Sequence, residues 1–170
     1  MRRLLLAGLA LVPVVLLGGC ASADGPAGEP PVSVLPADAT VVYAFRDSSV
    51  PPQYHRSVTL TVTADEARIV IDSYGDVLAD ERMSTPAAVW QQLGDTLPAI
   101  EALEVTDPGE GCVGGTSVEV TVSTPQDVLL SLDPQFCGGS NDGLEEPIEA
   151  WIAPARDLFP STDVLAPEGE

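Results

Sequence analysis

Lysine is absent from this chain of 170 residues, so all seven cationic side chains are arginines, and they stand against 26 aspartates and glutamates. The formal net charge is therefore −19 at pH 7. Proteins bind nucleic acid mainly by neutralising its phosphates with cationic side chains, and they attach to anionic lipid through basic clusters. The composition thus excludes nucleic acid as an expected partner and excludes purely electrostatic attachment to a membrane.

Aromatic residues and histidine are also scarce. Two tryptophans, three tyrosines and three phenylalanines all lie between residues 43 and 159, so we expect the hydrophobic core there. The single histidine, His55, follows a proline-rich stretch, and we expect it to be exposed in a loop. No nucleophile motif such as Gly-x-Ser-x-Gly accompanies it, and the absence of lysine excludes a Ser/Lys pair. A hydrolase is therefore the least favoured function.

The first nineteen residues have the three-part build of a secretory signal. Arg2 and Arg3 precede an apolar run, residues 4–17, that is too short for a permanent membrane span of about 20 residues. The ending Leu17-Gly18-Gly19-Cys20 resembles the lipobox of bacterial lipoproteins. This resemblance implies that residues 1–19 are removed and that Cys20, the mature N-terminus, carries a diacylglyceryl group on its sulfur. An ordinary secretory signal cleaved near residues 21–23 is the alternative.

Residues 20–39 predict a tether between that lipid and a folded domain of residues 40–160. The segment contains four prolines, two glycines and hardly any bulky side chain, so it cannot bury enough apolar surface to become ordered. As a flexible coil it would reach on the order of 25 Å. Residues 161–170 are expected to be a frayed tail.

Cysteine is rare as well, since Cys112 and Cys137 are the only ones besides Cys20. Two cysteines and one distant histidine are too few for a four-ligand zinc site, whereas an even number in an oxidising compartment favours a disulfide. The two cysteines lie five residues before and five residues after a predicted hairpin, at its open end. A Cys112–Cys137 bridge would stabilise the fold by about 3.5 kcal/mol in the chain-entropy model.

Period-two alternation and β-branched residues predict six strands. The clearest case is the second strand, in which Val58, Leu60 and Val62 alternate with threonines. The predicted strands span residues 40–46, 56–63, 68–72, 77–83, 117–123 and 128–132. Short turns join most neighbouring strands in the sequence, so we expect antiparallel hairpins.

Two stretches have helical spacing instead. The first has Thr85 as its N-cap and Pro86 at the first helical position, and it ends near Pro98. The second runs from residue 145 or 147 to residue 159, with a break at Pro154.

The resulting order is four strands, a helix, two strands and a helix. Strands and helices grouped in this way predict a two-layer α+β domain, with an antiparallel sheet of about six strands covered on one face by two helices. Trp90 and Trp151 lie on different predicted helices, each among apolar residues at helical spacing. We therefore expect both tryptophans to be buried against the sheet.

Neighbouring acids are expected by chance on solvated faces of so acidic a chain. They occur at Asp65/Glu66, Asp80/Glu81 and Glu145/Glu146. Asp142, Glu145 and Glu146 are weak calcium candidates, because their loop has oxygen ligands and a glycine turn but not the spacing of a calcium loop. Asp142 with Glu145 is explained more simply as a helix capping box. Glycine pairs after both cysteines predict close backbone packing rather than a phosphate cradle.

The lipobox, the proline-rich tether and the cysteine pair resemble, in general style, the small cysteine-bridged lipoproteins of high-G+C Gram-positive bacteria. This resemblance carries no catalytic residues. We expect a non-enzymatic binding or interaction module of the cell envelope, anchored on the extracytoplasmic face of the cell membrane, with an envelope protein as partner. No cofactor is expected besides the covalent lipid on Cys20. The alternative is a lipoprotein that binds a small ligand or a cation through acidic loops.

Overall fold

Alternating apolar and polar side chains build an antiparallel sheet. The computed structural model describes residues 34–107 and 114–169. In these ranges the strands are β1 (Thr40–Arg46), β2 (Ser57–Val62), β3 (Glu66–Ser73), β4 (Asp76–Ser84), β5 (Thr116–Ser123), β6 (Val128–Leu132) and β7 (Gln135–Phe136), and the helices are α1 (Ala87–Glu101), α2 (Glu145–Arg156) and α3 (Thr162–Leu165). Six of the strands agree with the sequence prediction to within two residues at each end, whereas β7 is not predicted.

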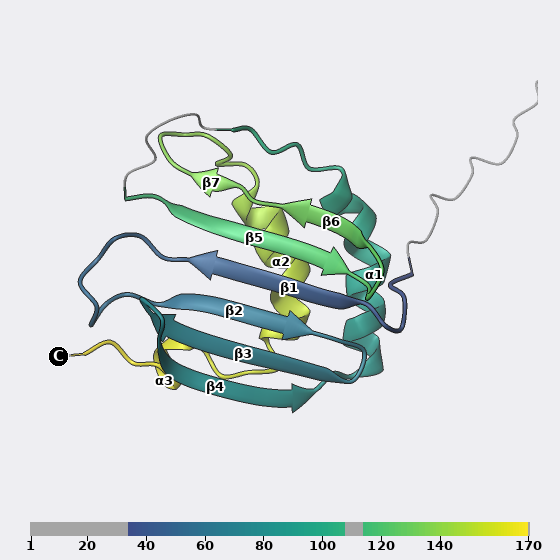
Figure 1. Cartoon of the computed structure of the whole chain (residues 1–170), viewed down its shortest axis with the longest axis horizontal. Coiled ribbons are helices and arrows are strands. Elements are labelled where there is room, and N and C mark those ends of the chain that lie inside the picture. Colours follow the sequence, from purple (N-terminus) through teal and green to yellow (C-terminus); the bar gives the residue numbers. More distant parts are fainter. Residues whose placement is uncertain (1–33, 108–113, 170) are drawn as a thin grey trace, which may run out of the picture. The chain divides into compact units, whose positions relative to one another are not determined.

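The strand order is β4-β3-β2-β1-β5-β6, with β7 also paired to β5 (Figure 1). All of these pairings are antiparallel. The first strand of the chain thus lies in the middle of the sheet, between β2 and the later strand β5. The predicted class is confirmed: an α+β fold with an antiparallel sheet and helices against it.

The hydrophobic core lies between the sheet and the layer formed by α1 and α2 (Figure 1). Every second residue of the inner strands points into it and is buried. The largest side chains that are almost fully buried include Tyr43, Leu60, Ile69, Ile71, Leu93, Ile148 and Ile152. Burial of one such side chain contributes about 1.5–3 kcal/mol.

The two tryptophans differ in burial. Trp151 of α2 is buried, and its indole Nε1 donates a hydrogen bond of 3.0 Å to the carbonyl oxygen of Leu93, which joins α2 to α1. Trp90 is only partly buried and packs against the core from its rim. The expectation that both tryptophans are buried is therefore right for Trp151 and wrong for Trp90, because Trp90 lies near the start of α1, where the helix faces the segment before β1.

The helix ends also differ from the sequence prediction. The N-cap of α1 is Pro86 with no side-chain hydrogen bond, and the buried Thr85 Oγ1 has no partner among the described residues. Pro98 lies inside α1, which continues to Glu101 because Ile100 is buried in the core. α2 likewise continues past Pro154. In both helices tertiary packing outweighs the backbone hydrogen bond that proline removes.

The folded part extends beyond both ends of the predicted domain. Leu35 and Ala39 are buried in the core. The last residues of the predicted tether, residues 20–39, therefore belong to the folded domain. Arg56 holds the C-terminal segment: its Nε donates to the carbonyl oxygen of Ala166 at 2.8 Å, and its Nη2 donates to that of Pro167 at 2.6 Å. The prediction of a frayed tail is therefore wrong, since the residues after α2 form α3 and dock onto this arginine. Within the described ranges no helix is both long and apolar enough to span a bilayer.

Candidate functional site

The residues predicted for lipidation and for the disulfide fall mostly outside the described ranges. Cys20 and Cys112 are among the residues that the structure does not describe. Cys137 directly follows β7, and its backbone forms an isolated antiparallel β-bridge with the backbone of Ser140. Lipidation at Cys20 and the Cys112–Cys137 pairing therefore stay predictions.

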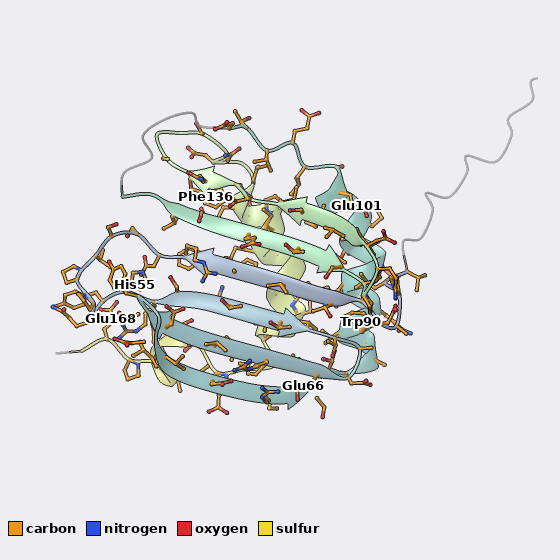
Figure 2. All side chains as sticks on the ribbon, viewed as in Figure 1. His55, Glu66, Trp90, Glu101, Phe136 and Glu168 are labelled. Atoms are coloured by element: carbon orange, nitrogen blue, oxygen red, sulfur yellow. The ribbon has the colours of Figure 1, made fainter. Side chains whose placement is uncertain are left out.

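His55 is buried, which corrects the expectation of an exposed loop histidine. Its side chain is only 5% exposed and stacks on the ring of Tyr74, with 3.9 Å between the ring centroids. Figure 2 shows His55 at the same end of the sheet as Glu168, where the amide of Gly169 donates to the carbonyl oxygen of Gln53 at 3.2 Å. Nδ1 of His55 has no hydrogen-bond partner among the described residues. The stacked imidazole therefore packs this loop against the β3–β4 turn.

Two of the neighbouring acid pairs supply ion pairs across β3 and β4. Arg68 forms a bidentate pair with Asp80, at 2.7 and 2.6 Å, and Arg82 contacts Glu66 at 2.6 Å. The hydrogen bonds from Arg68 lower the pKa of the Asp80 carboxyl and raise that of the guanidinium. All four side chains are partly exposed, so each pair contributes only modestly. These acids neutralise arginines and are not held as a catalytic carboxylate pair.

The weak calcium candidates do not form a site. Asp142, Glu145 and Glu146 are all exposed, and in the part of the chain that the structure describes no three histidine, cysteine or acidic side chains gather to hold a metal ion. The capping box is also wrong, because the N-cap of α2 is Leu144 without a side-chain hydrogen bond. Gly138 and Gly139 both have positive φ, of 62° and 91°, which explains this glycine pair by turn geometry.

A partly buried polar network joins the sheet to α2. The hydroxyl of Tyr43 donates to Glu149 Oε1 at 2.5 Å, and Glu149 Oε2 accepts a hydrogen bond of 3.0 Å from Arg156. Burial, reinforced by the bond to Glu149, raises the pKa of the Tyr43 phenol far above its ordinary value. The phenol therefore stays protonated, and the network positions α2 on β1.

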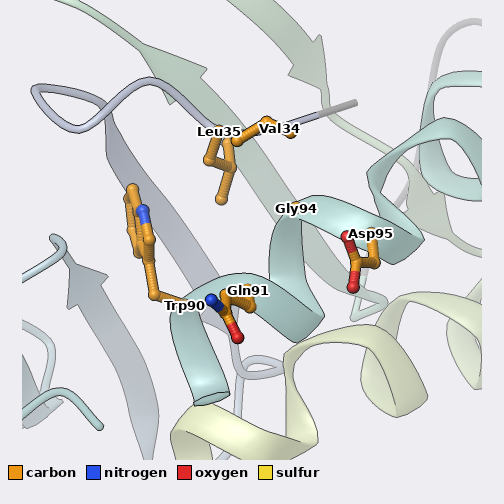
Figure 3. A pocket seen from close by; sticks show the side chains of 6 residues that line it. All are labelled: Val34, Leu35, Trp90, Gln91, Gly94 and Asp95. Carbon is orange, nitrogen blue, oxygen red and sulfur yellow. The ribbon is translucent and has the colours of Figure 1, made fainter. Parts of the chain in front are cut away.

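The hollows on the surface are small. One of about 310 Å³ lies beside α1, where Leu35 and Trp90 line opposite sides (Figure 3). Another, of about 220 Å³, lies between α1 and α2. Ligand pockets usually have volumes of about 300–1,000 Å³ with several polar groups converging on the ligand. The first hollow lies at the lower limit of this range, and Gln91 and Asp95 are the polar aliphatic side chains that line it.

The two edge strands of the sheet, β4 and β6, resemble each other in the residues that directly follow their hairpin turns. A shift of register on β4 makes Leu78 an extra residue opposite β3, and a similar shift on β6 makes Leu129 extra opposite β5. Both leucines are 44% exposed, and each follows an exposed valine, Val77 (62%) or Val128 (66%). Each edge therefore presents a Val-Leu pair at a bulge.

Beyond the bulges the two edges differ in charge. β4 has charged side chains at its first residue, Asp76, and after its bulge at Asp80, Glu81 and Arg82. β6 reads Val-Leu-Leu-Ser-Leu and has none. Charges on an edge strand discourage pairing with another chain, and β6 lacks this protection. β6 is therefore the edge at which a further strand could add.

Asn141 forms hydrogen bonds along the same side of the sheet beyond β6, where β7 pairs with β5. Its Nδ2 donates 3.0 Å hydrogen bonds to the carbonyl oxygens of Gln135 in β7 and of Thr106, and its Oδ1 accepts one of 2.8 Å from the Thr106 amide. Asn141 has a φ of 63°, a left-handed conformation that asparagine tolerates better than most residues. Within residues 34–107 and 114–169, no strand pairs with the outer side of β6, and Asn141 with Thr106 covers the continuation of this edge at β7.

Sequence reasoning located strand β6 but not its exposure. Alternation does not reveal which strands end up at the edges of a sheet. A usable signal is nevertheless present, because β6 is a short uncharged run between Asp127 and Asp133 in a strongly acidic chain.

No protein-family model matches the chain, and no curated protein or solved structure is significantly similar to it. A function must therefore be inferred from the residues and their arrangement.

Proposed function

We propose that this chain is a lipid-anchored, non-enzymatic module on the extracytoplasmic face of the cell membrane, and that it binds an extended segment of another envelope protein. The segment adds as a further strand to the sheet at β6. The observation that carries this proposal is that β6 is uncharged and that its outer side pairs with no strand in the part of the chain that the structure describes. Strand addition obtains its affinity from main-chain hydrogen bonds and its specificity from the side chains beside them.

The anchor is supported by the lipobox-like ending Leu17-Gly18-Gly19-Cys20. After cleavage before Cys20, five arginines remain against 26 acids, a formal net charge of −21. A chain with that charge is repelled by anionic lipid headgroups. A covalent lipid therefore accounts for attachment where electrostatics does not.

Strand addition is supported by the contrast between exposure and packing on β6. Leu130 and Leu132 point into the core, which fixes the strand against β5. Val128 and Leu129 are exposed on this strand, whose outer side pairs with no strand of the described residues. A rigid edge with adjacent apolar side chains reduces the entropy that a peptide-binding surface loses on association.

The anchor is tested by Cys20→Ala in the full chain. We expect the wild type to partition into the detergent phase and to carry acyl chains by intact mass. The variant should remain unprocessed or be found in the aqueous fraction. An unacylated mature N-terminus in the wild type would refute the anchor.

The binding edge is tested by photo-crosslinking in intact cells. A photoreactive amino acid replaces Leu129 in one variant and Leu78, which has the same 44% exposure on the opposite edge, in the control. We expect a discrete adduct with another protein from position 129 and little or none from position 78. Equal adducts from both positions, or none from position 129, would contradict binding at β6.

A further inference from the structure

The charges at the two ends of β6 indicate what kind of segment binds there. We propose, on the basis of the function proposed above, that the partner segment is apolar in its middle and carries a basic residue at each end. Asp127 directly precedes β6 and Asp133 directly follows it. Both are exposed, and neither forms an ion pair within the described ranges. The strand is thus an uncharged, mostly apolar stretch between two acids that form no ion pair with an arginine of the described chain.

The spacing of these acids fits one short strand. Six residue steps separate Asp127 from Asp133, or roughly 20 Å in extended backbone. A peptide strand that pairs along β6 has its own ends next to Asp127 and Asp133, whether it runs parallel or antiparallel. Oppositely charged residues on adjacent strands stabilise the pairing, and like charges oppose it. Basic flanks are therefore favoured in either direction.

A second copy of this chain does not meet this requirement. If two β6 strands paired antiparallel about Leu130, each Asp127 would lie opposite an Asp133, which places like charges together at both ends. Outside residues 1–19 the chain has five arginines, and no two of them are closer than ten positions in the sequence. It therefore contains no segment with basic residues at the spacing of these two acids. The partner is a different protein, and the net charge of −21 steers a basic segment towards it.

The experiment uses the full chain in detergent micelles and two labelled peptides. One is Lys-Val-Thr-Val-Thr-Val-Lys, and the other has glutamate in place of both lysines. We expect the lysine peptide to bind about tenfold more tightly by fluorescence anisotropy, since two attractive cross-strand pairs replace two repulsive ones. Its binding should shift the backbone amide signals of β6 in NMR spectra and should weaken as salt is added.

A double variant separates the local charges from the overall charge of the chain. Asp127→Asn with Asp133→Asn should remove most of the preference for the lysine peptide. Asp76→Asn with Glu81→Gln makes the same change of net charge on the β4 edge and should leave the preference intact. If both peptides bind equally well at β6, the charge inference fails while strand addition stands. If neither peptide binds, or if the chain instead dimerises through β6, the inference and the proposed mode of binding both fail.

Discussion

The two edge strands start alike and end differently. Both β4 and β6 have an exposed Val-Leu pair at a bulge, but β4 continues with charged residues and β6 with leucines. On β6, Leu130 and Leu132 belong to the core and are each only 9% exposed. Met83, on the equivalent face of β4, is 49% exposed. One edge is thus protected by charge and contributes little to the core. The other is held by the core and is left without charge, which is the combination that binding requires.

The largest expected effect tests whether β6 is part of the core and β4 is not. Leu132→Ala removes a buried side chain opposite Val120 and should lower the free energy of unfolding by about 2–4 kcal/mol. Met83→Ala on β4 should lower it by less than about 1 kcal/mol, because that side chain is half exposed. Urea unfolding of both variants measures the difference. Equal losses would mean that the helix layer supports both edges alike.

A smaller effect is expected where Asn141 limits the open edge. Asn141→Ala removes its hydrogen bonds to Gln135 and Thr106 and places alanine at a positive φ. We expect a loss of about 1–3 kcal/mol and faster hydrogen exchange of the Thr106 amide. Asn141→Gly removes the same hydrogen bonds but tolerates the backbone conformation, so it should speed exchange equally and destabilise less. Unchanged exchange in both variants would show that Asn141 does not close the edge.

The smallest effect concerns the ion pair on β4. Because Arg68 lowers the pKa of Asp80 in the folded state, the pair stabilises the fold above the ordinary aspartate pKa of about 4, and this contribution is lost as the pH falls through the folded-state pKa. The wild type should therefore melt slightly higher than Asp80→Asn at pH 7, and the difference should vanish at strongly acidic pH. Asp76→Asn, which involves an acid without a described ion pair, is the control. A difference that grows on acidification would contradict the pairing.

Much of the fold follows from local pattern. The ranges of β1 and β6 agree with their predictions at both ends, because alternation of apolar and polar residues is encoded within a single strand. β7 escapes prediction because two residues are too few to show a period, and only its pairing with β5 defines it as a strand. The helix ends are misjudged where burial of Ile100 outweighs the signal from Pro98.

The environment of single side chains is less predictable. His55 follows prolines and polar residues that are typical of an exposed loop, yet it is buried, with the ring of Tyr74 from the β3–β4 turn stacked on it. The C-terminal segment looks frayed in sequence, and Arg56, far away in the chain, supplies the hydrogen bonds that hold it. Both outcomes depend on contacts between distant segments, which no local pattern records.

The sequence by itself determines the positions of six strands and two helices to within about three residues, the α+β class, the acidic character and the lipobox-like start of this chain. The tertiary structure decides which strands become edges. β1 pairs with β2, its neighbour in the sequence, and on its other side with β5, which comes much later in the chain. Because of this second pairing, β1 lies in the centre of the sheet and β4 and β6 lie at its two edges. That pairing depends on fitting both strands under α1 and α2, so the open edge at β6 is a consequence of long-range packing.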